Sequence, residues 1–161
     1  MVKSKDKTNV MRILDQKKVE YKSYSFETDN QYSGIDVASI IGKDVEEVFK
    51  TLVTEGKSGA NYVFIIPVHK ELDLKKAAIA VDEKSIHMIK SKDLLGLTGY
   101  IHGGCSPIGM KKEFTKVFHN TVEALDTITF SGGKLGRQVE LKASDLKKVI
   151  KFQVADLVVE G

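Results

Sequence analysis

Residues 99–112, with the sequence GYIHGGCSPIGMKK, carry the densest group of residue types that could bind or activate a ligand. The first eleven of them include four glycines and one of the two prolines of the chain, and neither a helix nor a strand tolerates that density. We therefore predict an irregular loop, and long irregular loops inside compact domains are usually functional. Gly103 and Gly104 would allow main-chain N–H groups to approach a carbonyl or phosphate oxygen closely. The alternative interpretation is a plain long turn.

Two side chains in this loop invite a catalytic interpretation. Ser106 has no G-x-S-x-G context and no base placed to activate it, so we interpret it as a hydrogen-bonding loop residue held extended by Pro107. Cys105 is the only cysteine, and none of the four histidines comes with a signature that places it beside the thiol. His102 is too near in the chain to be assumed aligned with it. We therefore expect a small, semi-buried thiol, with a catalytic cysteine as the alternative.

A lysine interrupts the otherwise apolar strand pattern VFKTLV at residues 48–53. Alternation along the strand places Lys50 on the same face as Val48 and Leu52. A buried lysine without a partner is costly, so this position predicts a pocket that opens beside the strand. The alternative is a lysine at a sheet edge whose charged end reaches water.

A third segment, TFSGGKLGRQVEL at residues 129–141, reads as a strand, a glycine-rich turn and a second strand. In this order and spacing, the three segments resemble the YbaK/EbsC family, free-standing relatives of the editing domain inserted in bacterial prolyl-tRNA synthetases. The likeness runs from about residue 8 to residue 156, and the sequence LDLKKAA at residues 72–78 adds to it.

The resemblance implies a fold and an activity. The fold would be a single α/β domain, residues 1–161, with a mixed, curved β-sheet flanked by helices. The activity would be removal of a wrong amino acid from a charged tRNA, which exists because a pocket cannot reject a slightly smaller or isosteric amino acid by binding alone. The YbaK branch clears cysteine from tRNA(Pro), and the thiol of the substrate is thought to help break the ester. Two alternatives stay open: an Ala-tRNA(Pro) deacylase that uses water, and a non-catalytic tRNA-binding or regulatory module on the same fold.

Roles for individual residues follow from the same resemblance. Lys50 is the functional lysine, which either holds the tRNA end through a phosphate or orients the ester. Gly103 and Gly104 match the G-G-x-S-P loop of the family, where a backbone site would stabilise charge on the ester carbonyl. Substrate binding is implied for the other matched residues, Ser106, Pro107, Ser131, Gly132 and Gly133.

The chain also departs from the family pattern. Its second turn reads S-G-G-K-L-G-R where members more often have S-G-G-K-R-G, which leaves the role of Arg137 open, and Gln138 stands where a polar or acidic residue is common. Members often have a tyrosine at the end of the first strand and an aromatic residue before the next helix, where this chain has Phe26 and Ser33. Phe26 and Tyr32, which can substitute for the second aromatic residue, are the predicted substrate-binding residues here. These differences bear on substrate preference rather than on the fold.

Composition restricts the class of protein. With 161 residues, 42% of them hydrophobic and 29% charged, the chain suits one globular domain with a proper core. The single cysteine excludes an internal disulfide, and the sequence shows neither a membrane-length apolar run nor a signal-peptide pattern, so we expect the cytoplasm. No pair of histidines or cysteines has metal-ligand spacing, so we expect no metal and no cofactor. Residues 1–7 are expected to be frayed.

The expected main partner is the acceptor end of an aminoacylated tRNA, with neither DNA nor a membrane as a partner. The net charge of +3 is too small to prove nucleic-acid binding by itself. Lys111 and Lys112 flank the glycine loop and are candidates for weak phosphate contact, against the alternative of a solubilising surface. Because the sequence has no anticodon-binding domain or basic arm, prolyl-tRNA synthetase is expected as a further partner that selects the tRNA.

Periodicity and capping residues predict alternating helices and strands. Helices are predicted at residues 8–18, 33–42, 73–80, 91–96, 120–125 and from 144 onward. Strands are predicted at residues 21–26, 48–53, 62–68, 86–89, 114–118, 127–130 and 138–141. Several links are too short for helical crossovers, which favours a mixed sheet.

Overall fold

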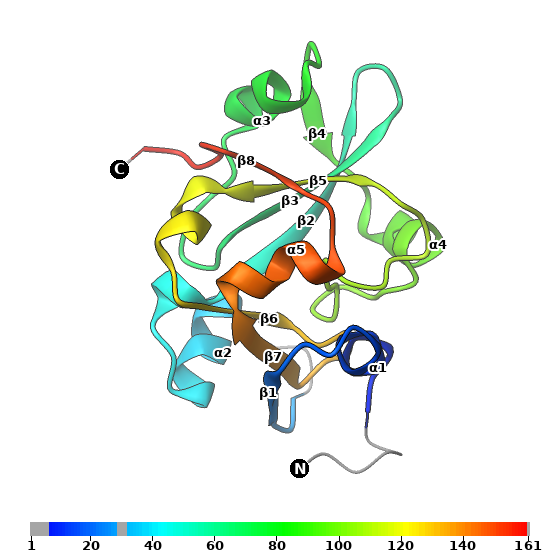
Figure 1. Ribbon diagram of the computed structural model, residues 1–161. Helices are drawn as coiled ribbons and strands as arrows, with labels where there is room; N and C mark the ends of the chain where they lie inside the picture. Colours follow the sequence, from blue (N-terminus) through cyan, green and yellow to red (C-terminus); the bar gives the residue numbers. More distant parts are fainter. Residues whose placement is uncertain (1–6, 29–31, 161) are drawn as a thin grey trace.

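The computed structural model of the chain describes residues 7–28 and 32–160 (Figure 1). Its strands form two sheets, an antiparallel one with the order β1-β7-β6 and a mixed one with the order β4-β2-β3-β5-β8. In the mixed sheet, β5 runs parallel to both of its neighbours, and the other pairs are antiparallel. The strands are β1 (Tyr21–Ser25), β2 (Phe49–Gly56), β3 (Asn61–Pro67), β4 (Ile86–Met88), β5 (Thr115–His119), β6 (Thr127–Ser131), β7 (Arg137–Lys142) and β8 (Gln153–Ala155).

Helices begin at the side chains that the sequence marks as caps. The Thr8 hydroxyl accepts a hydrogen bond from the N–H of Met11 at 3.2 Å, and Ser33 forms a capping box with Asp36. Asp73 accepts hydrogen bonds from two backbone N–H groups of the helix that follows it. The α-helices are α1 (Asn9–Gln16), α2 (Gly34–Ile41), α3 (Leu74–Val81), α4 (Leu94–Thr98) and α5 (Leu146–Val149). Short 3₁₀ segments are η2 (Val45–Glu47), η3 (Ser91–Asp93), η4 (Asn120–Ala124) and η5 (Ala143–Asp145).

The five-stranded sheet is buried on both faces, as the alternation along β3 shows. Val63 and Ile65 belong to the larger core, to which the three-stranded sheet, α1 and α5 also contribute. Phe64 and Ile66 pack on the other face with residues of α3. Figure 1 shows α3 above the five-stranded sheet and the three-stranded sheet below it. The predicted α/β fold with a mixed sheet and flanking helices is confirmed, with the difference that a second, antiparallel sheet is present.

Two element boundaries differ from the prediction near the glycine loop. The helix predicted to stop at Gly96 continues as α4 to Thr98, and Gly99 ends it with a left-handed φ of 84°. A glycine is tolerated inside a short helix, whereas the left-handed conformation that closes a helix favours glycine strongly. The predicted helix at residues 120–125 is instead the 3₁₀ segment η4.

No helix among residues 7–28 and 32–160 combines the length and the apolar character needed to cross a bilayer. Apart from Lys7, the residues predicted to be frayed at the N-terminus lie outside the described residues.

Candidate active site

A cavity of about 600 Å³ opens along one edge of β2. The other edge of the strand pairs with β3 from Phe49 to Glu55. On the cavity side, β4 begins to pair with β2 only at Thr54, and β6 forms a single bridge, from Thr129 to Val48, the residue just before β2. Every residue from Phe49 to Val53 lines the cavity. The strand therefore presents its backbone edge to the cavity as well as its side chains.

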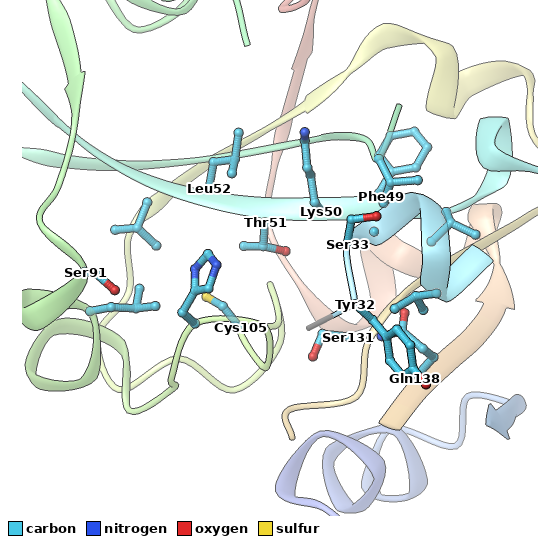
Figure 2. Close-up of a pocket in the computed structure, with 18 of the residues that line it drawn as sticks. Tyr32, Ser33, Phe49, Lys50, Thr51, Leu52, Ser91, Cys105, Ser131 and Gln138 are labelled. Atoms are coloured by element: carbon cyan, nitrogen blue, oxygen red, sulfur yellow. The ribbon is translucent and has the colours of Figure 1, made fainter. Parts of the chain in front are cut away.

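Lys50 and Thr51 both line the cavity but lie on opposite faces of β2 (Figure 2). Lys50 and Leu52 project from one side of the strand, and Thr51 projects from the other side, where Cys105 also lies. Leu52 packs against the core under α3, which agrees with this alternation and confirms the predicted shared face of Lys50 and Leu52. The cavity thus wraps around the edge of β2, with a cation on one side and the glycine loop on the other.

Lys50 is a half-buried cation. Burial lowers the pKa of its ammonium group below the ordinary value, and the negative charge of Glu71 opposes that shift only in part. Among the described residues, no carboxylate forms a salt bridge with Lys50. A cation held in this way is available for an anion that enters the cavity, such as a phosphate group.

The two central glycines of the loop are placed differently. Gly103 lines the cavity and has a left-handed φ of 86°. The N–H of Gly104 donates to the carbonyl of Ile101 at 3.0 Å, so this donor is already paired within the loop. A Cβ atom at Gly104 would lie 3.3 Å from backbone atoms of Lys134 and Leu135, so close packing on the second glycine turn accounts for this glycine. A backbone donor for an ester oxygen stays a prediction for Gly103.

The three residues that follow Gly104 in the loop, Cys105, Ser106 and Pro107, are buried. Ser106 is fully buried, and its hydroxyl accepts a hydrogen bond from the N–H of Ile108 at 3.3 Å, as expected for a structural loop residue. Pro107 is buried as well, and neither residue is among those that line the cavity. Cys105 does line it, but burial raises the pKa of its thiol to about 12, although a hydrogen bond with Thr98 opposes the shift.

Only the first residue of the second glycine turn faces the cavity. Ser131 lines it, and the Ser131 hydroxyl accepts a hydrogen bond from the N–H of Gly133 at 3.1 Å. The N–H of Gly132 donates to the carbonyl of Arg137 at 2.9 Å, which closes the turn behind Ser131. Arg137, the residue that departs from the family pattern, donates from Nη1 to the hydroxyl of Ser25 at 2.8 Å and so ties β7 to β1.

The aromatic residues predicted to bind substrate form a pair at the cavity wall. Tyr32 lines the cavity together with Ser33 and Gln138, two other positions of family departure. Phe26 is not a lining residue, but its ring stands edge-to-face against Tyr32 with the centroids 6.2 Å apart. Phe26 therefore contacts a cavity-lining ring without lining the cavity itself.

The lysine pair after the glycine loop lies outside the cavity. Lys111 and Lys112 are exposed, and the ammonium group of Lys111 donates to the carbonyl of Gly96 at 3.5 Å. Contact of these lysines with phosphate stays a prediction.

Several residues of the cavity wall escaped sequence reasoning, among them the polar residues Thr51 and His102. The hydroxyl of Thr51 is buried without a hydrogen-bond partner. The sequence signal that could have found Thr51 is its position directly after Lys50, because successive strand residues face opposite sides of a sheet. His102 was set aside for its nearness to Cys105 in the chain, yet the curved loop brings both residues to the wall.

The described part of the cavity wall contains no aspartate or glutamate. Within residues 7–28 and 32–160, no group of three or more His, Cys, Asp or Glu side chains is arranged to hold a metal ion.

Comparison with known proteins gives one family match and two similar curated proteins. The family model described as an aminoacyl-tRNA editing domain matches residues 28–149. The chain is 42% identical over 156 residues to a protein of Enterococcus faecalis provisionally named Cys-tRNA(Pro)/Cys-tRNA(Cys) deacylase EbsC, covering 96% of this chain and 95% of that protein. It is 29% identical over 84 residues to the proline–tRNA ligase of Fervidobacterium nodosum, which amounts to 52% of this chain but 14% of that enzyme.

A solved structure shares the whole fold. A crystal structure described provisionally as a trans-editing enzyme for prolyl-tRNA synthetase matches with a TM-score of 0.79 at 21% identity, covering 95% of this chain and 99% of that one. The matched residues of the family model include β2, the glycine loop and the second glycine turn, all of which contribute to the cavity wall. The chain therefore belongs to the family of aminoacyl-tRNA editing domains.

Proposed function

We propose that this chain is a trans-editing aminoacyl-tRNA deacylase that removes mischarged cysteine from tRNA(Pro). Family membership supports the deacylase activity, and the name of the Enterococcus faecalis relative supports the cysteine substrate. The observation that carries the mechanism is that neither Cys105, at the cavity wall, nor its chain neighbour Ser106 is activated as a nucleophile. The raised pKa of Cys105 keeps its thiol protonated at neutral pH, and the Ser106 hydroxyl is buried in a loop hydrogen bond.

A substrate that brings its own nucleophile removes the need for one in the protein. In a cysteinyl ester, the sulfur bonds to the ester carbonyl carbon, the bond from that carbon to the ribose oxygen breaks, and the thiol proton ends on the ribose oxygen. The product is a small cyclic thiolactone, which water opens to free cysteine. The protein then contributes position and polarisation of the carbonyl rather than covalent chemistry.

Of the two roles open to Lys50, phosphate binding agrees better with its position. Lys50 lies on the opposite face of β2 from Thr51 and Cys105, whereas both faces border the same cavity. A substrate that crosses the strand edge would place a phosphate of the tRNA end at Lys50 and the aminoacyl group on the side of the glycine loop. An ammonium group is well suited to such a phosphate contact.

A second candidate is an Ala-tRNA(Pro) deacylase that uses water, and His102 favours it. This imidazole lines the cavity, and a neutral imidazole can accept a proton from an attacking water molecule. In this mechanism the amino acid contributes no nucleophile, so a small side chain that leaves room for water is preferred.

Deacylation of Cys-, Ala- and Ser-tRNA(Pro) by the purified protein tests these proposals. Serine is close to cysteine in size but is a far weaker nucleophile at neutral pH, so thiol assistance predicts cysteine well ahead of both other substrates. Alanine ahead of cysteine would replace the first candidate by the second. Intact substrates, together with acceptor-stem binding that weakens steeply with salt, would favour the non-catalytic tRNA-binding module.

The proposed partner is the acceptor end of the charged tRNA, and prolyl-tRNA synthetase is the proposed source of tRNA selection. The partial match to a proline–tRNA ligase supports this relation. The lone cysteine of the chain supports a reducing compartment, the cytoplasm.

A further inference from the structure

The direction of the hydrogen-bonding groups of β2 follows from its register with β3. The carbonyl of Val48 accepts a hydrogen bond from the N–H of Val68 at 2.8 Å, which makes these two residues a bonded pair. Bonded and non-bonded pairs alternate along an antiparallel ladder. Lys50 therefore directs its N–H and carbonyl toward β3, whereas Thr51 directs both of these groups toward the cavity side.

Neighbouring strands cover the cavity-side edge of β2 on either side of Thr51. Val48 bridges to Thr129 of β6, and the carbonyl of Val53 accepts a hydrogen bond from the N–H of Ile89 at 3.4 Å. Between these contacts, no strand of residues 7–28 and 32–160 pairs with Thr51 on this side. Its hydroxyl is also buried without a partner. Thr51 thus brings three groups to the cavity that no described protein group pairs with: its backbone N–H, its backbone carbonyl and its side-chain hydroxyl.

We propose that Thr51 receives the aminoacyl group of the substrate by pairing with it as one strand residue pairs with another. This inference rests on the proposed deacylase function. An aminoacyl ester contains the same N–Cα–C=O unit as a residue in a strand. Its ammonium group donates to the Thr51 carbonyl, and the Thr51 N–H donates to the ester carbonyl oxygen, as in a bonded antiparallel pair. The same N–H polarises the carbonyl that is attacked.

The pairing fixes where the side chain of the amino acid lies. Opposed residues of an antiparallel pair place their side chains next to each other on one face of the sheet. An L-amino acid would therefore place its side chain beside that of Thr51, on the side of β2 where Cys105 lies (Figure 2). There a cysteine thiol can donate to the Thr51 hydroxyl, whereas the methyl group of alanine cannot. Thr51 would thus hold the backbone unit of the substrate and favour cysteine over alanine.

Amide hydrogen exchange measured by NMR tests the backbone pairing directly. The probe is 3′-(L-cysteinylamino)-3′-deoxyadenosine, in which a stable amide replaces the ester. The control is its 3-mercaptopropionyl counterpart, which lacks only the ammonium group. At saturation, we expect the cysteinyl probe to slow exchange of the Thr51 N–H by about tenfold, since this backbone amide gains a hydrogen bond. We expect the control to slow the same exchange much less.

The outcomes separate this inference from the proposed function. If the cysteinyl probe shifts the amide signal of Gly103 but leaves Thr51 exchange unchanged, the pairing is overturned and the deacylase remains. If the probe shifts no amide of the cavity wall and Cys-tRNA(Pro) stays intact in the deacylation assay, the proposed function fails and the pairing fails with it.

Two substitutions test the hydroxyl separately from the backbone. Thr51→Val keeps the branched shape and the strand edge but lacks the hydroxyl, and Thr51→Ser keeps the hydroxyl. The readout is the ratio of kcat/KM for Cys-tRNA(Pro) to that for Ala-tRNA(Pro), which a general loss of activity does not change. We expect this ratio to fall about two- to tenfold in Thr51→Val and to stay within about twofold of wild type in Thr51→Ser, as the loss of one weak hydrogen bond predicts. An unchanged ratio in Thr51→Val would overturn the part given to the hydroxyl.

Discussion

Replacing Lys50 with methionine separates the two roles that a lysine at this cavity can have. Methionine keeps an unbranched apolar stem and removes the charge. The ammonium group is half-buried without a salt bridge among the described residues, so its removal eliminates a desolvation cost. We expect the free energy of unfolding to stay unchanged or to rise. A change in activity then reports on the substrate rather than on folding.

The size of the effect follows from one phosphate contact. A hydrogen bond to a charged group contributes about 1.5–3 kcal/mol, and the half-exposed position of Lys50 favours the lower end. A loss of about 1.5 kcal/mol corresponds to about a tenfold rise in KM. Because a phosphate remote from the ester is held equally in the ground state and the transition state, kcat should change little. One lost contact with a single-stranded end should also lower the salt slope of log KM by about 0.7.

The assay is deacylation of Cys-tRNA(Pro) over ranges of substrate and KCl concentration. Lys147→Met is the matched control, because Lys147 is an exposed lysine of α5 outside the cavity. We expect its KM to stay within about twofold of wild type, as for an exposed charge without a specific contact. A fall of about tenfold in kcat with unchanged KM in Lys50→Met would place Lys50 at the reacting ester. That result would refute the phosphate-binding role of Lys50, which we inferred because Lys50 and Thr51 lie on opposite faces of β2.

Further predictions concern the thiol and the glycines. Cys105→Ser should keep the deacylation rate within about threefold of wild type. The raised pKa of Cys105 should make labelling of its thiol at pH 8 far slower in the folded than in the denatured protein. Equal labelling rates in the two states would contradict this prediction. Gly104→Val should push the glycine loop off the second turn and cost about 1–3 kcal/mol of stability, so an unchanged melting temperature would refute the packing argument. Gly99→Ala and Gly136→Ala share a left-handed φ, but only at Gly136 would the new Cβ overlap a backbone atom, the Phe26 carbonyl oxygen. Urea unfolding should show a loss of about 1–2 kcal/mol for Gly99→Ala and at least about twice that for Gly136→Ala, and equal losses would contradict the overlap.

Features that depend on neighbouring residues could be predicted from the sequence. The caps at Thr8, Ser33 and Asp73 are bonds between a side chain and backbone groups two or three residues away, so the local sequence contains all of their partners. The shared face of Lys50 and Leu52 follows from strand alternation in the same way.

Features that depend on distant segments could not be predicted. The glycine at position 104 suggested an approach to a ligand, but its neighbour is the backbone of Lys134 and Leu135, about thirty residues further along the chain. The importance of Thr51 likewise depends on where β4 and β6 stop pairing with β2, and no pattern within residues 48–53 contains that information. The resemblance to a family identified which segments form the site. How these segments contact one another could be seen only in the folded structure.

The order of the three-stranded sheet has a consequence for biosynthesis. Ser25 of β1 pairs with Arg137 of β7, 112 residues later in the chain. At a synthesis rate of about 5–20 residues per second, β1 is synthesised roughly 6–22 s before its partner strand. An unpaired strand during that interval is able to join a strand of another nascent chain. The polar residues of β1, Lys22, Ser23 and Ser25, oppose such aggregation, so the composition of this strand protects the chain before the fold is complete.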